Sequence, residues 1–227
     1  MEPIRILYFS DVLCIWAYIA QIRLDELKSA FGNQISFEFH FTPVFGDARR
    51  KLEKNWEGRG GLAGYSQHIK EVAGKFEHIP IHPEIWTKQI PDSSTSCHLF
   101  LRAIKIVEDK GLIEPNIEGG AFERATWSFR SAFFQNQENI AQRQVQLALA
   151  KELGFPTEEI EAVIASGEAY ADLSRDFELV KEYTATISPT LIFNEGRQRL
   201  NGNVGYRVIE ANIRELLYSP TEAHSWC

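Results

Sequence analysis

The spacing of apolar residues over the first 43 positions predicts three elements. Ile4 to Phe9 is an apolar run, which places a strand at about 3–9. Residues 14–30 carry apolar side chains at helical spacing, and Gly32-Asn33 follows as a typical helix end. Residues 35–41 alternate between apolar and polar, which indicates a half-buried strand. This β-α-β order favours two parallel strands joined by a right-handed crossover.

Helical spacing dominates the middle of the chain. A mixed region of loop and short helix at 44–59 leads into a series of expected helices. They lie near residues 65–75, 94–110, 118–135, 138–153, 157–165 and 168–184. Strands return at 190–193 and 198–200, separated by the hairpin signal Asn194-Glu195-Gly196, and a last helix follows at 206–217.

The order of these elements predicts how the chain is divided. Residues 1–43 plus 183–227 supply the strands, and residues 44–182 form an inserted helical domain. A parallel half first and an antiparallel hairpin last resembles the thioredoxin fold. The expected fold class is therefore α/β, a thioredoxin fold with a large helical insertion.

Composition narrows the class of function. The chain has 227 residues and a formal net charge of −7, which argues against a nucleic-acid surface. The basic cluster Arg49-Arg50-Lys51 is short, and we expect it to lie on a solvated loop or helix face. No apolar stretch approaches the ~20 residues that span a bilayer, so we expect no membrane partner. The start shows no leader pattern and the three cysteines are scattered, so we expect a reduced, cytoplasmic protein.

Cys14 is the strongest candidate for chemistry. It lies where the first strand passes into the first turn of a helix. Unpaired backbone N–H groups and the helix dipole stabilise a thiolate at such a place. Cysteines in these settings have pKa values from roughly 3.5 to 7.5. Cys14 is therefore the expected catalytic nucleophile.

Three stretches carry a family resemblance. Ser10 to Tyr18 resembles the active-site segment of the DsbA-like thioredoxin superfamily, whose usual form is Cys-Pro-Trp-Cys-Tyr. Here Ile15 replaces the proline and Ala17 replaces the second cysteine, which leaves the motif C-x-x-A. Residues 186–190 are similar to the family's cis-proline segment, and 201–210 look like the start of the last helix in the cytoplasmic FrnE-like branch. The superfamily also includes the kappa-class glutathione transferases and the 2-hydroxychromene-2-carboxylate isomerases.

The resemblance implies a substrate site around Pro189. It implies a cis bond between Ser188 and Pro189, with the backbone N–H and C=O of Ser188 free to bind an extended peptide or glutathione. Ser188, Pro189, Trp16 and Asn203 make up the expected substrate-binding set. Trp16 either packs at the domain junction or lines the substrate face. Asn203 stands at the start of the last helix, where the transferase branch usually has an acidic residue.

Three further residues are possible members of the site. Two hypotheses apply to Asp11: its side chain caps the first helix, or its negative charge raises the pKa of Cys14. Ser94 to His98 resembles a helix start in the inserted domain of the FrnE-like branch. Cys97 in that segment either packs inside a helix or releases a Cys14 adduct, and His98 is its neighbour.

Two other features carry little weight. We expect Cys227, at the very end of the chain, to play no part in releasing a Cys14 adduct. His78 and His82 are separated by Pro80, which breaks any helix that would align them, so we expect no metal site.

Three functions stay open at this point. The first is DsbA-like thiol–disulfide exchange by a monothiol route through Cys14, because Ala17 cannot release a mixed disulfide. The second is a glutathione-dependent transferase or isomerase of the kappa or chromene-carboxylate type. The third is a non-catalytic module that binds peptides. Expected partners are a small thiol, disulfide or electrophile, or an extended peptide, with glutathione as a possible co-substrate, no tightly bound cofactor, and a possible homodimer.

Overall fold

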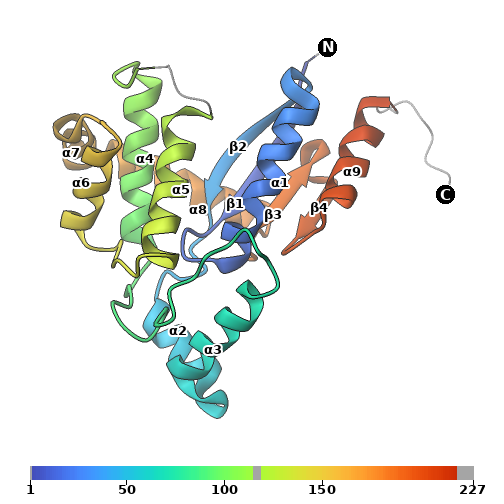
Figure 1. The fold of residues 1–227 in the computed structure, drawn as a ribbon. Helices are drawn as coiled ribbons and strands as arrows, with labels where there is room; N and C mark the ends of the chain where they lie inside the picture. The colour runs from blue at the N-terminus through green and yellow to red at the C-terminus, as the bar shows by residue number, and fades with distance from the viewer. Residues whose placement is uncertain (1, 115–118, 219–227) are drawn as a thin grey trace.

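One mixed sheet organises the computed structural model, which describes residues 2–114 and 119–218. Its described strands are β1 (Ile4–Ser10), β2 (Ile35–Phe41), β3 (Thr190–Phe193) and β4 (Gln198–Asn201). They lie in the order β2-β1-β3-β4 (Figure 1). β1 and β2 are parallel, and β3 is antiparallel to both β1 and β4. The predicted β-α-β unit, the hairpin and the thioredoxin-like fold class are confirmed.

Helix α1 (Ile15–Phe31) makes the crossover between the two parallel strands. It ends at Gly32, whose φ of 50° favours a residue without a β-carbon. Leu24 and Leu27 of α1 are buried against the sheet, together with Ile209 of α9 (Tyr206–Tyr218). Thus α1 and α9 cover one face of the sheet (Figure 1).

The hairpin between β3 and β4 has the local conformation that its sequence favours. All three residues of the turn Asn194–Gly196 have positive φ, at 49°, 56° and 92°. Asn and Gly adopt this region at low cost, and the short connection sets β3 antiparallel to β4.

The helical insertion follows β2. It contains α2 (Ala48–Trp56), α3 (Gly61–Ala73), α4 (Thr95–Asp109), α5 (Gly120–Phe134), α6 (Arg143–Glu152), α7 (Thr157–Ser166) and α8 (Glu168–Glu182). Helices α4 to α7 stand together beside α1, whereas α2 and α3 project beyond the end of the sheet where α1 begins (Figure 1). The expected helix at 138–153 begins later, at Arg143. Gln137 has a φ of 60° and the Asn139 side chain accepts the Ala141 N–H, so a turn occupies this stretch.

Helix α8 covers the opposite face of the sheet. Leu179 of α8 packs on a small cluster that includes Leu7 and Phe9 of β1. The helix therefore shares packing with the strands although it precedes residue 183. The division at residues 43 and 183 stays a prediction.

A buried ion pair closes the outer edge of β2. Arg102 of α4 donates to the Phe39 carbonyl at 2.6 Å and contacts Asp176 of α8, also at 2.6 Å. Asp176 in turn accepts the Phe41 N–H at 2.9 Å. The edge groups of β2 thus find side-chain partners in place of another strand, which blocks pairing with a second chain at this point.

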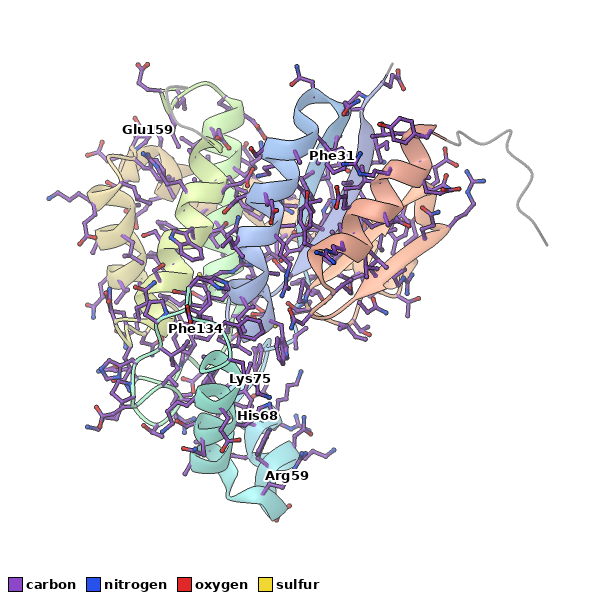
Figure 2. All side chains as sticks on the ribbon, turned by 45° about the vertical axis from the view of Figure 1, so that its right-hand side comes forward. Phe31, Arg59, His68, Lys75, Phe134 and Glu159 are labelled. Atoms are coloured by element: carbon purple, nitrogen blue, oxygen red, sulfur yellow. The ribbon has the colours of Figure 1, made fainter. Side chains whose placement is uncertain are left out.

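The insertion and α1 meet in an aromatic contact at the foot of α5, where Phe134 lies (Figure 2). Its fully buried ring stacks on Tyr18 of α1 with 4.9 Å between centroids.

Across the described residues, no helix combines the length and apolar character needed to cross a bilayer.

Candidate active site

Cys14 occupies the predicted junction between strand and helix. It is the N-cap residue of α1, with extended backbone at φ −85° and ψ 118°. Its side chain is 6% exposed, and the Sγ–H donates to the Ser188 carbonyl at 3.2 Å. The thiol therefore reaches from the start of α1 to the segment that leads into β3.

Burial dominates the electrostatics of this thiol. Burial raises the pKa of Cys14, and the charge of Asp11 raises it further. The Ser188 contact and the N–H groups of Trp16 and Ala17 lower it, but they do not outweigh burial. Burial therefore opposes the thiolate that the start of α1 was expected to stabilise, and the Sγ–H is engaged with the Ser188 carbonyl.

The bond between Ser188 and Pro189 is cis, as the resemblance implied. The Ser188 carbonyl is not free, because it accepts the Cys14 thiol. The Ser188 hydroxyl accepts the Asp11 N–H at 2.9 Å. Ser188 thus connects both ends of the Asp11–Cys14 turn, and a substrate that uses its carbonyl either shares this oxygen with the thiol proton or displaces it.

Asp11 does not cap α1, because Cys14 does so without a side-chain hydrogen bond. Its fully buried carboxylate accepts the Leu13 N–H at 2.9 Å. The other carboxylate oxygen accepts the Phe45 N–H and the Ser94 hydroxyl, both at 2.8 Å. Asp11 therefore joins the turn before Cys14 to two segments of the insertion.

His98 of α4 completes this buried network. Its Nε2 accepts the Val12 N–H at 3.1 Å and lies 3.6 Å from Asp11 Oδ1, while its ring stacks on Phe41. Burial would raise the pKa of Asp11, but the positive charge that His98 carries when protonated and the N–H groups of Phe45 and Leu13 hold it below its usual range. Asp11 and His98 are therefore brought together beside Cys14.

The other expected site residues have separate surroundings. Trp16 is half-buried in the first turn of α1 and packs edge-on against Phe76, with ring centroids 6.4 Å apart. Asn203 is exposed and accepts a hydrogen bond from Arg23 of α1, so the structure does not bring its side chain to Cys14.

Cys97 is a packing cysteine by its position. It is fully buried in the core of the insertion, and burial raises its pKa well above the usual value. Neither Cys14 nor Cys97 forms a disulfide. Cys227 lies outside the described residues.

Residues 2–114 and 119–218 contain no cluster of three or more His, Cys, Asp or Glu side chains that could hold a metal ion.

The sequence did not single out two residues near the site. Ser94 binds Asp11, and Lys51, which the sequence placed on a solvated face, is half-buried and interacts electrostatically with Asp11 and Cys14. Asp11 lies between an apolar strand and an apolar helix, which indicates a buried carboxylate that needs hydrogen-bond donors. This was the only sequence feature that pointed to a partner such as Ser94. Lys51 offered no such feature, because it sits among other basic residues.

Comparisons with known proteins found relatives in sequence and in structure. The ClpXP adapter protein SpxH of Bacillus licheniformis is 29% identical over 150 residues, covering 59% of this chain and 48% of that protein. The chain therefore spans about half the length of that relative. A probable DsbA oxidoreductase from Streptomyces coelicolor has a TM-score of 0.71 at 17% identity, covering 98% of this chain and 93% of the other.

A second solved structure is the cytosolic disulfide reductase DsbM from Pseudomonas aeruginosa with GSH. It has a TM-score of 0.62 at 18% identity, covering 92% of this chain and 99% of the other. At these identities the two structures show a shared fold. The family model described as the DSBA-like thioredoxin domain matches residues 5–214. The chain therefore belongs to the DSBA-like thioredoxin domain family.

Proposed function

We propose that the protein exchanges thiols and disulfides by a monothiol route through Cys14, with glutathione as the second thiol. One observation carries this proposal. Cys14, at the start of α1, donates its thiol proton to the Ser188 carbonyl. Three residues after Cys14, where a second cysteine would stand, the chain has the buried Ala17. The site therefore offers one sulfur beside the backbone segment before Pro189.

The chemistry balances in two steps. Cys14 loses its proton and attacks a glutathione mixed disulfide, which forms a Cys14–glutathione disulfide and releases the substrate thiolate, which takes up a proton. A second glutathione then attacks the adduct, forms oxidised glutathione and returns Cys14 as a thiol. Ala17 has no sulfur to perform this second step from within the chain.

The burial of Cys14 and its contact with Ser188 determine how a substrate would reach the sulfur. Because Cys14 donates its Sγ–H to the Ser188 carbonyl and burial raises its pKa, the thiol must give up this contact and its proton before it attacks a disulfide. The freed Ser188 carbonyl can then accept a hydrogen bond from the backbone of glutathione or of an extended peptide. Trp16, next to Cys14, would flank that ligand. DsbM, the neighbour with GSH, supports a small thiol as partner and a reducing, cytoplasmic setting.

The raised pKa of Cys14 supports a second candidate. A neutral thiol can donate a hydrogen bond to the thiolate of a bound glutathione without reacting. This role fits a glutathione-dependent transferase or isomerase. It predicts that glutathione binds beside Cys14 and no mixed disulfide forms.

Turnover of a glutathionylated peptide with reduced glutathione separates the two candidates. We expect Cys14→Ser to abolish turnover and Cys97→Ala to retain it, because Cys97 is enclosed in the core. Ala17→Cys should convert the trapped Cys14 adduct into an intramolecular disulfide. Full turnover by Cys14→Ser would refute the monothiol proposal. Glutathione binding without turnover in the wild type would favour the second candidate.

A further inference from the structure

Lys51 differs from the two basic residues beside it. Arg49 and Arg50 are exposed, as expected of a solvated helix face, whereas Lys51 is half-buried. All three belong to the first turn of α2, beyond the end of the sheet where α1 begins (Figure 1). The position of α2 brings Lys51 to the end of the molecule that holds Cys14.

The contacts of Lys51 lead directly into the active-site network. Its ammonium donates to the Val44 carbonyl at 2.6 Å and lies 5.2 Å from the centre of the Phe45 ring. Phe45 donates its N–H to Asp11 at 2.8 Å. Two adjacent residues therefore connect Lys51 to the turn that carries Cys14.

Lys51 has no carboxylate within ion-pair distance among the side chains that the structure describes. Burial lowers its pKa, while the charge of Asp11, and that of Cys14 in its thiolate form, raise it. Asp11 already accepts three hydrogen bonds of its own. A partly desolvated ammonium without its own counter-ion gains more from an incoming anion than a solvated one does.

We propose that Lys51 recognises the negative charge of an anionic thiol or disulfide substrate as its sulfur approaches Cys14. This inference rests on the proposed exchange at Cys14 and names its substrate class. A carboxylate-bearing thiol such as glutathione is favoured over a neutral disulfide of similar size. Lys51 is then a specificity-determining residue, and the positive charge matters more than the shape of the side chain.

Two alkylating reagents that differ in charge test this role without any turnover. Anionic iodoacetate and neutral iodoacetamide react with the same Cys14 sulfur, so the ratio of their rates reports the local charge. We expect Lys51→Met to lower the iodoacetate-to-iodoacetamide ratio by about threefold or more at low salt. Lys51→Arg should restore the ratio, and the exposed Lys54→Met on the same helix should leave it unchanged. Peptide mapping assigns the modification to Cys14.

Salt provides a measurement that needs no variant. The ratio of the wild type should fall towards that of Lys51→Met as ionic strength rises to about 1 M, because the Debye length shrinks to roughly 3 Å. An unchanged ratio in Lys51→Met, or an equal fall in Lys54→Met, would overturn the inference.

Turnover then separates this inference from the proposed function. If exchange proceeds, Lys51→Met should raise KM for glutathione disulfide and leave KM for the neutral bis(2-hydroxyethyl) disulfide unchanged; an equal change for both would overturn the role of Lys51. If no exchange occurs although the alkylation ratio depends on Lys51, the charge recognition stands and the proposed function fails.

Discussion

Replacing Asp11 with Asn tests the buried network that holds the active-site turn. The carboxylate accepts three hydrogen bonds, from the Leu13 N–H, the Phe45 N–H and the Ser94 hydroxyl. An Asn side chain has nearly the same shape but one accepting oxygen, and its NH₂ group must face a donor. If the oxygen keeps Phe45 and Ser94, the Leu13 N–H is left buried without an acceptor.

The expected cost follows from these contacts. A buried donor without a partner costs about 1–3 kcal/mol, and hydrogen bonds to a charged acceptor exceed neutral ones by about 1 kcal/mol each. Release of the buried charge offsets part of this sum. We therefore expect Asp11→Asn to lower the free energy of unfolding by about 2–4 kcal/mol. Because the Asp11 charge raises the pKa of Cys14, the same change should lower that pKa and speed alkylation at pH 7.

Two measurements check this prediction. Urea unfolding followed by tryptophan fluorescence gives the stability, and the pH dependence of Cys14 alkylation gives the direction of the pKa change. Asp47→Asn is the matched control, because Asp47 is an exposed N-cap of α2 and Asn caps equally well. A loss of stability below about 0.5 kcal/mol in Asp11→Asn, or slower alkylation, would refute the reasoning.

Three further predictions concern the fold. Arg102→Met should cost about 3–5 kcal/mol in urea unfolding, because Asp176 keeps a buried charge, whereas the exposed Arg175→Met should cost less than about 1 kcal/mol. Equal costs would contradict the buried pair. Phe134→Ala should lower the free energy of unfolding by about 3–5 kcal/mol, because it removes the ring that stacks on Tyr18 and leaves a cavity. A cost near zero would show that this contact does not stabilise the fold. The pKa of Asp11 lies below its ordinary value, so its contribution to stability is full above about pH 4 and is lost as the pH falls through the folded-state pKa. Unfolding free energies measured from pH 6 to 2 should therefore fall less steeply for Asp11→Asn than for the wild type, and parallel curves would contradict this assignment.

Local patterns predicted much of the fold. The apolar run of β1, the helical spacing of α1 and the alternation of β2 gave a parallel pair, and Asn194-Glu195-Gly196 gave the hairpin. These elements are set by contacts between residues close in sequence. Their order was enough to place Cys14 at the start of α1 and Pro189 before β3.

The surroundings of Cys14 were not predictable in the same way. Asp11 meets Phe45 and Ser94 across 34 and 83 positions of the chain, and these contacts depend on how the insertion packs. A helix start alone favours a thiolate, but only the packed structure shows that burial outweighs it. Lys51 was likewise hidden, since its burial depends on the side of α2 that faces Val44.

The most direct test of the account is the mixed disulfide at Cys14. The native protein is incubated with oxidised glutathione, and intact mass with peptide mapping locates the product. The account predicts one glutathione on Cys14, removed by excess reduced glutathione and absent from Cys14→Ser, with Cys97 unmodified. A native protein that forms no adduct at Cys14, under conditions where the unfolded chain does, would contradict exchange at this thiol.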